Sequence, residues 1–352
     1  MKKILHIVEV LEPIGGTSNK LRYLCEESVN GFDCYIICLN YSKMNEEFEK
    51  LGVKIIALND TGIGAILKIR KQLSDISPDY VVTHFTRSLI FFEVASLGMK
   101  IKSFHHEHGP ADLKPRNIHR KIEKYILRNK KFVVNSNYTA KTYISEYGKE
   151  LNPIVIYNPF KSRSLPKINL VEKGLREINI LHVGGLVAWR NQSIIIHAAN
   201  ILSKASNIAV NVYFVGDGDE RINLSKIEIN DSVKVYFEGY QTDLDNYYSK
   251  CQIYVNTATH EGFGIATVEA MAAGKLTFVA NRSANVEIVD DNVNGFHFEA
   301  NCAKSLAIKV GGLLLLDGEK QREIAQAGIE KVKQEYTKEK YFKNISLVLG
   351  SL

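Results

Sequence analysis

The 352-residue chain lacks any run of about 18 apolar residues, so the sequence predicts no membrane-spanning helix. Its five cysteines are an odd number without a C-x-x-C pair, which favours buried thiols in a reducing cytosol over disulfides or a metal site. Tracts of low complexity and short internal repeats are also absent. What is present is a globular composition, 45% hydrophobic and 24% charged, in a chain long enough for two domains.

Short apolar runs rich in Ile, Val and Tyr alternate with helix-like stretches along the chain. This alternation predicts the α/β class, with parallel sheets in two doubly wound, Rossmann-like domains. We expect domains at 1–165 and 175–335, and a C-terminal helix over 336–352 that packs back on the first domain. Ligands of such folds bind outside the carboxyl ends of the strands, so the site is expected in a cleft between the domains. The predicted strands are 3–9, 34–39, 53–58, 80–84, 100–106, 131–135, 154–157, 178–183, 209–215, 233–237, 252–256, 276–280 and 296–298.

One string, THEGFGIATVEAMAAG over residues 259–274, is the most informative. The apolar run before it predicts a buried strand, and its Ala-rich part predicts a helix over 265–273 that stops at the final glycine. Gly262 and Gly264 then lie in a strand-to-helix loop with little side-chain bulk. Backbone N–H groups in such a loop can approach a phosphate, whose charge the helix dipole favours.

Two glutamates flank this helix start with the spacing E-x7-E. Glu269, about one turn into the helix, can accept hydrogen bonds from ribose hydroxyls, and Glu261, before the turn, can accept them from a sugar. The layout therefore suits a nucleotide sugar. The alternative is that both glutamates only stabilise the helix dipole, by about 0.3–1 kcal/mol each.

Further candidate loops follow other predicted strands. Gly15 and Gly16 come after the first strand without the G-x-G-x-x-G pattern, which counts against an NAD site. The string LHVGGLVAWRNQ, residues 181–192, opens the second half of the chain. Three of the ten histidines lie in SFHHEHGP, residues 103–110, where His-x-His beside an acid is a pattern of metal sites. Adjacent strand residues point in opposite directions, however, and no further ligand group is evident, so no metal site is expected.

Taken together, these strings resemble the retaining glycosyltransferases of family 4, which have the GT-B fold of two Rossmann-like domains. Residues 259–274 match the family's Glu-Gly-Phe-Gly and Glu-Ala-Met-Ala-x-Gly text, 181–192 match V-G-R-L-x-x-x-K-N-Q, and 103–110 match a T-x-H-G-like string. The resemblance implies transfer of a hexosyl unit from a nucleoside diphosphate sugar, expected to be a UDP-sugar, with retention at the anomeric carbon. It implies no metal and no cofactor, an acceptor-binding domain at 1–165 and a nucleotide-sugar-binding domain at 175–335.

The resemblance also implies the site residues, including two departures from the family pattern. Gly185 stands where the family has an arginine, and Arg190 stands where it has a lysine, so Arg190 becomes the expected main ligand of the diphosphate. The implied catalytic residues are His108, with His106 as the alternative, Arg190 and Glu261. The implied donor-binding residues are Gly16, Gly184, Gly185, Arg190, Tyr240, Gly262, Phe263, Gly264, Ile265 and Glu269.

The net charge of +6 lies wholly in residues 1–160, which contain 23 Lys and Arg against 17 Asp and Glu. Many of these cations crowd the segment 114–131, where apolar residues recur at helical spacing. Such a segment predicts contact with an anionic membrane surface or a phosphorylated acceptor, and a solvated helix face is the equal alternative. We therefore expect a cytoplasmic protein, peripheral on the inner face of the membrane, with no nucleic-acid partner.

The predicted function is transfer to a saccharide or lipid-linked acceptor in surface glycan biosynthesis. A nucleotide-sugar epimerase or hydrolase on the same fold is one alternative. A nucleotide-sugar-binding protein without catalysis is another, and Gly185 is its best support.

Overall fold

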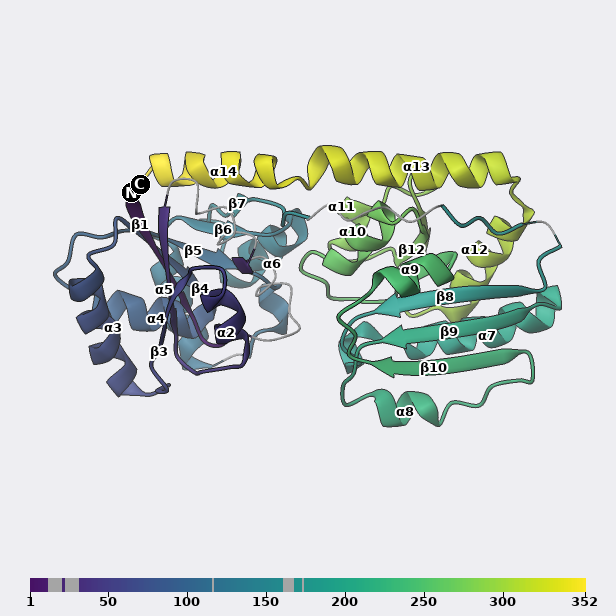
Figure 1. The fold of residues 1–352 in the computed structure, drawn as a ribbon, viewed down its shortest axis with the longest axis horizontal. Coiled ribbons are helices and arrows are strands. Elements are labelled where there is room, and N and C mark those ends of the chain that lie inside the picture. Colours follow the sequence, from purple (N-terminus) through teal and green to yellow (C-terminus); the bar gives the residue numbers. More distant parts are fainter. Residues whose placement is uncertain (12–20, 23–31, 116, 161–167, 173) are drawn as a thin grey trace. The chain divides into compact units, whose positions relative to one another are not determined.

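The computed structural model describes residues 1–11, 21–22, 32–115, 117–160, 168–172 and 174–352. These residues form two compact units, one of Met1–Pro159 with Lys338–Leu352 and one of Phe160–Thr337 (Figure 1). Each unit has its own sheet, in which every strand pair is parallel. The GT-B fold expected from the sequence is thus confirmed as two parallel α/β sheets flanked by helices.

The first unit has a seven-stranded sheet in the order β3-β2-β1-β4-β5-β6-β7. Its strands are β1 (Lys2–Val8), β2 (Phe32–Cys38), β3 (Lys54–Ala57), β4 (Tyr80–His84), β5 (Lys102–Glu107), β6 (Phe132–Val134) and β7 (Ile154–Val155). Its helices are α2 (Met44–Glu49), α3 (Ile63–Ile76), α4 (Phe85–Ala95), η1 (Ala111–Leu113), α5 (Ile118–Leu127), α6 (Asn137–Tyr147) and α14 (Lys338–Gly350).

Strand β1 shows why this sheet has two buried faces. Successive strand residues point to opposite sides, so Ile4 and Val8 enter one apolar cluster while Leu5 and Ile7 enter another. Helices α3 and α4 cover the second of these faces. The C-terminal helix α14 contributes its buried residues to the first cluster, so the end of the chain completes the core of the N-terminal unit.

The second unit has a six-stranded sheet in the order β10-β9-β8-β11-β12-β13. Its strands are β8 (Glu177–Val183), β9 (Ala209–Val215), β10 (Val233–Gly239), β11 (Ile253–Asn256), β12 (Leu276–Ala280) and β13 (Phe296–Phe298). Its helices are η2 (Ala188–Arg190), α7 (Ser193–Ser206), α8 (Arg221–Ser225), α9 (Asp245–Lys250), α10 (Ile265–Ala272), α11 (Asn285–Ile288), α12 (Ala303–Leu315) and α13 (Gly318–Glu335).

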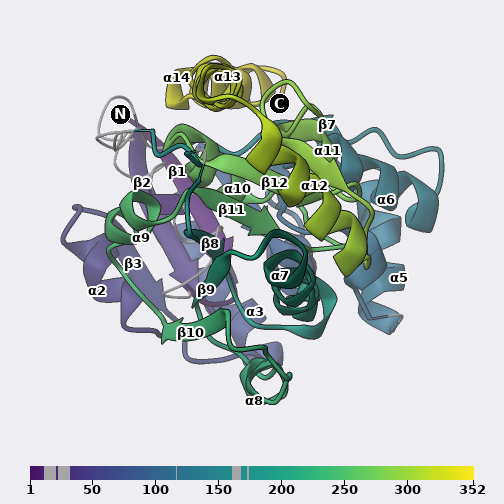
Figure 2. The same ribbon diagram turned by 90° about the vertical axis from the view of Figure 1, so that its right-hand side faces the viewer.

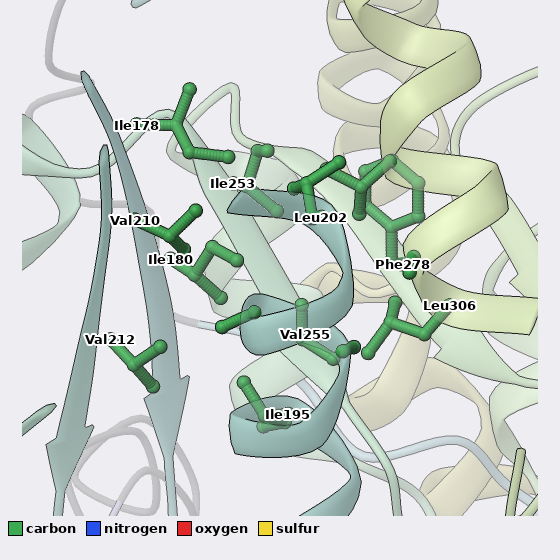
Figure 3. Packing of buried hydrophobic residues seen from close by; sticks show 14 of the residues in the cluster. Ile178, Ile180, Ile195, Leu202, Val210, Val212, Ile253, Val255, Phe278 and Leu306 are labelled. Atoms are coloured by element: carbon green, nitrogen blue, oxygen red, sulfur yellow. The ribbon is translucent and has the colours of Figure 1, made fainter. Parts of the chain in front are cut away.

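The core of the second unit lies between its sheet and the neighbouring helices α7 and α12 (Figure 2). Figure 3 shows Ile180 of β8 and Val212 of β9 facing Ile195 of α7, while Leu306 of α12 closes the far side. Burying such branched side chains contributes about 1.5–3 kcal/mol each. This core holds the carboxyl ends of β8 and β11 next to each other, and the candidate site is built there.

The predicted strands are all confirmed, with bounds that differ by a few residues at most. Cys34, Cys38 and Cys251 are buried free thiols, as expected for core positions. Among the described residues, no helix is both long enough and apolar enough to cross a membrane.

Candidate active site

The loop after β8 places the Arg190 side chain against Gly184. Gly184 has φ +150°, and a Cβ there would collide with Nη1 of Arg190. The short helix η2 that carries Arg190 is tied to the loop after β11, because Thr257 Oγ1 donates to the Arg190 carbonyl oxygen at 2.6 Å. The guanidinium also lies over the Trp189 ring, 4.8 Å from its centre. These contacts hold the arginine side chain across the backbone of Gly184.

Arg190 meets Glu261, the first glutamate of the E-x7-E string. Arg190 Nη2 lies 3.4 Å from Glu261 Oε2, and the two side chains are 18% and 12% exposed. The structure therefore brings together two residues that the sequence assigns to different parts of one donor. Both keep an accessible edge, so a bound anion and sugar can reach them.

The N-terminus of α10 lies directly after Glu261. Gly264 adopts φ +83°, and a Cβ there would press on Glu261 Cγ and Thr267 Oγ1, each at 3.3 Å. Glycine is therefore required for this close turn. Gly262 and Gly264 are both buried, and Ile265 begins the helix, as predicted.

Phe263, another predicted donor ligand, has its side chain in the core. It is 3% exposed and packs edge-on against Tyr336 of the same unit, with ring centres 5.4 Å apart. Only its backbone is therefore placed to contact a donor, whereas its ring anchors the loop.

Glu269 lies on the first turns of α10 and is 9% exposed. Tyr248 of α9 donates its hydroxyl to Glu269 Oε2 at 3.3 Å. The tyrosine fixes the carboxylate in one orientation.

An amide network holds the loop between β11 and α10. Asn256 Nδ2 donates to Thr267 Oγ1 at 3.0 Å and to Asn285 Oδ1 at 3.2 Å, and Asn256 Oδ1 accepts from the Ala258 N–H at 3.0 Å. Asn256 and Asn285 are buried, and the sequence did not indicate them. For Asn256, the position at the end of an apolar strand is the only signal, and it is weak because turns also favour this residue.

His182 is a third residue that sequence analysis missed. Its Nδ1 donates to the Val255 carbonyl oxygen at 2.9 Å, and its Nε2 accepts from Gln192 Nε2 at 3.4 Å. Burial, and then the positive charge of Arg190, lower the pKa of His182 to about 4 although the bond to Val255 opposes this. The imidazole is therefore neutral at physiological pH. Its hydrogen bond with Gln192 connects it to the loop that carries Arg190.

The turn 216–218 packs against the loop that carries Arg190. Cβ atoms on Gly216 and Gly218 would collide with the carbonyl oxygens of Gly184 and Leu186, so both glycines let this turn pack against the Arg190 loop. Asp217 is engaged by Arg221 at 2.9 Å. The Gly218 amide, and then Arg221, lower its pKa.

Gly185 and Tyr240 complete the predicted donor residues of this unit. A Cβ on Gly185 would find its nearest neighbour, the Asp217 carbonyl oxygen, at 3.8 Å, so there is room for a side chain. Tyr240 is 57% exposed, and its hydroxyl lies 3.5 Å from that same oxygen. Gly16, in the other unit, lies outside the described residues.

In the first unit, His108 follows β5 and is half-buried, whereas His106 is 1% exposed. His108 Nε2 lies 2.9 Å from Nδ1 of His84, which ends β4. Asn135 Nδ2 donates to the His108 carbonyl oxygen at 2.7 Å. Of the two predicted alternatives, His108 is therefore the one with an accessible ring.

Several cations of the basic segment 114–131 are paired with carboxylates. Lys114 Nζ lies between two buried carboxylates, 2.8 Å from Glu107 Oε1 and 2.6 Å from Glu123 Oε1. Although burial raises the pKa of Glu107, Lys114 and His105 hold it below the usual value. The other pairs are Arg120 with Glu146, Arg128 with Glu150 and Lys130 with Glu93. Glu93, Glu146 and Glu150 lie outside the segment, so local sequence patterns do not show these pairs.

Two family models match consecutive parts of the chain. Glycosyltransferase Family 4 covers residues 14–162, and Glycosyl transferases group 1 covers residues 168–331. The chain belongs to glycosyltransferase family 4.

Curated relatives of this family 4 chain match only in part. An N,N'-diacetylbacillosaminyl-diphospho-undecaprenol alpha-1,3-N-acetylgalactosaminyltransferase of Campylobacter jejuni is 25% identical over 174 residues, which are 49% of this chain and 44% of the relative. Sucrose synthase 6 of Arabidopsis thaliana is 32% identical over 103 residues, 28% of this chain and 11% of that enzyme. The matches thus span less than half of either relative.

Solved structures share the fold over the whole chain. A glycosyltransferase from Rickettsia africae superposes with a TM-score of 0.81 at 20% identity, covering 99% of this chain and 98% of that one. Anabaena HepE in complex with UDP-glucose superposes with a TM-score of 0.82 at 19% identity, covering 100% of both chains. These neighbours confirm the GT-B fold of this family 4 chain.

Proposed function

We propose that this chain is a retaining glycosyltransferase that moves a hexosyl unit from a UDP-sugar to a saccharide or lipid-linked acceptor in surface glycan biosynthesis. One observation carries the proposal: Arg190 and Glu261 meet between Gly184 and the N-terminus of α10. A guanidinium, helix-start amides and a carboxylate are thus gathered at one sheet edge, and a nucleoside diphosphate sugar needs these groups. The UDP-glucose complex of Anabaena HepE supports a UDP-sugar as the donor.

Arg190 and the amides of residues 262–265 would stabilise the negative charge that develops on the leaving diphosphate. In this proposal they would do so without a metal ion. Glu261 would orient the sugar through its hydroxyls, and Glu269 would accept hydrogen bonds from the ribose. Because Glu261 is tied to Arg190 and Glu269 to Tyr248, we assign neither as a nucleophile. The acceptor oxygen would attack on the face that the diphosphate leaves, and a phosphate oxygen would take its proton.

The first unit would bind the acceptor, with His108 beside the transferred sugar. The half-buried ring of His108 and its position just past β5 support this role. The Campylobacter relative is named for a diphospho-undecaprenol-linked saccharide, which supports a lipid-linked saccharide as the acceptor class.

Helix α5 would bring the protein to the inner face of an anionic membrane. Its outer face presents Ile118, Ile122 and Tyr125, which are 63%, 37% and 71% exposed. These positions follow the helical spacing of a single stripe, and Lys121 lies beside them. Because several neighbouring cations are paired, the attraction would depend on this apolar stripe as much as on charge.

The decisive experiment is acceptor-dependent turnover. Purified protein is incubated with UDP-hexoses, with and without lipid-linked saccharides, and UDP release and the anomeric configuration of the product are measured. The proposal is supported if UDP is released only when acceptor is present and the product keeps the anomeric configuration of the donor sugar. Release of UDP at the same rate without acceptor would indicate a hydrolase. Conversion of the donor into an isomeric nucleotide sugar would indicate an epimerase. Binding without turnover of any donor would indicate a non-catalytic protein, which Gly185 favours.

A further inference from the structure

Strand register places four histidines on one face of the first sheet. His6 of β1 pairs with Val82 of β4, and His84 lies two residues beyond Val82, on the same face. His84 pairs in turn with His106 of β5, and His108 lies two residues beyond His106. No third ligand for His106 and His108 is evident from the sequence, whereas the fold supplies His84 from the neighbouring strand.

The imidazoles of this histidine cluster are in direct contact. His84 Nδ1 lies 2.9 Å from His108 Nε2, and His84 Nε2 lies 3.0 Å from His6 Nδ1. The rings of His106 and His108 are stacked with centres 4.6 Å apart. One ring nitrogen each of His84, His106 and His108 lies within 4.8 Å of those of the others.

We propose that His84, His106 and His108 form a binding site for a divalent transition metal ion such as Zn²⁺. Nitrogens of two zinc ligands in tetrahedral geometry lie about 3.3–3.4 Å apart, given Zn–N bonds of about 2.0–2.1 Å. The facing nitrogens of His84 and His108 are slightly closer than this, because one proton joins them. A metal ion would replace that proton after small side-chain rotations, and imidazole ligands favour Zn²⁺, Cu²⁺, Ni²⁺ or Co²⁺ over Mg²⁺ and Ca²⁺.

The surroundings of the histidine cluster favour a bound metal ion over a proton shared between two imidazoles. With His84 Nδ1 on the metal, its Nε2–H would donate to His6 Nδ1, which is the kind of outer hydrogen bond that orients metal-bound histidines. His84 and His106 are 0% and 1% exposed, and His108 is half-buried. Three protein nitrogens and one water would complete a four-coordinate site.

The opposite face of the same strands carries a second cluster of possible metal ligands. There His105, Glu107 and Glu123 also converge, but Lys114 Nζ already lies within 2.8 Å of both carboxylates. That ammonium occupies the position that a metal ion would take. Metal binding is therefore assigned to the histidine face alone.

The test uses untagged full-length protein, stripped with a chelator and titrated with Zn²⁺ by calorimetry and with Co²⁺ by visible absorption. We expect one equivalent of Zn²⁺ per chain, a Co²⁺ spectrum typical of nitrogen ligands, and a melting temperature raised by Zn²⁺. His84→Asn, His106→Asn and His108→Asn should each weaken binding by about 100-fold or more, and His6→Asn by about 10- to 100-fold.

The matched controls are His119→Asn and His197→Asn, which change exposed histidines on α5 and α7. Each cluster variant is first compared with wild type by circular dichroism in chelator. If a buried variant fails to fold, half-buried His108→Asn provides the measurement. Absence of Zn²⁺ binding by the wild type would overturn the proposal. Binding that the two control substitutions weaken as much as the cluster substitutions would overturn it as well.

Discussion

Arg190 Nη2 lies 3.4 Å from Glu261 Oε2, and this pair joins the loop after β8 to the start of α10. The arginine also crosses the backbone of Gly184, which has no side chain to obstruct it. A guanidinium held in this way is already oriented before a diphosphate arrives, so little reorganisation is needed on binding.

Replacing Arg190 tests this orientation. We expect Arg190→Ala to lower kcat by about 100-fold or more, the cost of losing a donor that stabilises developing negative charge. Arg190→Lys should recover part of the rate, because a point charge returns without the planar fork. Steady-state kinetics measure both variants, with Arg322→Ala on the exposed side of α13 as the control. Unchanged kinetics in Arg190→Ala would rule out its role.

Glu269 is expected to act on donor binding. Glu269→Ala removes an ionised acceptor worth about 1.5–3 kcal/mol, so the Kd for UDP should rise by about 10- to 150-fold. Tyr248→Phe is the control, because it removes the hydroxyl that orients this carboxylate and keeps the carboxylate itself. Calorimetry with UDP measures both. An affinity for UDP that stays normal while only the melting temperature falls would make Glu269 structural.

The adjacent glycines of the β8 loop should respond differently to substitution. Gly184→Ala adds a Cβ that collides with Arg190 Nη1 at φ +150°, so we expect a strain of about 1–3 kcal/mol and a displaced, less active guanidinium. Gly185→Ala has its nearest neighbour at 3.8 Å and should change neither stability nor rate. Gly185→Arg restores the cation of the family pattern and should raise kcat. Thermal melting and kinetics of the three variants check this contrast, and equal loss from Gly184→Ala and Gly185→Ala would contradict it.

His182 should make stability depend on pH. Its pKa is lowered from 6.5 to about 4 in the folded protein, so the unfolded chain takes up the proton first as the pH falls. The free energy of unfolding should therefore decrease between about pH 6.5 and pH 4, by roughly 2 kcal/mol at pH 5. Urea unfolding at pH 7.5 and pH 5 measures this loss, and His182→Gln should show a smaller one. The same pH dependence in both proteins would exclude His182 as its source.

How far the sequence could predict these features depends on their range along the chain. Strands of a parallel sheet are buried on both faces, so each appears as a continuous apolar run, and the 265–273 helix has its stop signal at Gly274. Strand order, which local patterns do not contain, decides two contacts. These are the contact of Arg190 with Glu261 and the contact of His84 with His108. The same limit applies to the pairs of Arg120 with Glu146 and Lys130 with Glu93, whose members lie far apart in the sequence.

The outer face of α5 gives the prediction most sensitive to conditions. Ile118→Ser and Tyr125→Ser should reduce co-sedimentation with anionic vesicles, because each removes apolar surface that would enter the lipid interface. Lys121→Glu should reduce it further by reversing about 1 kcal/mol of attraction, and added salt should weaken the charge-dependent part. Ile308→Ser is a matched control, since Ile308 on α12 is 62% exposed against 63% for Ile118. Equal and negligible binding of wild type to anionic and neutral vesicles would leave α5 as a solvated helix face and point to a soluble acceptor.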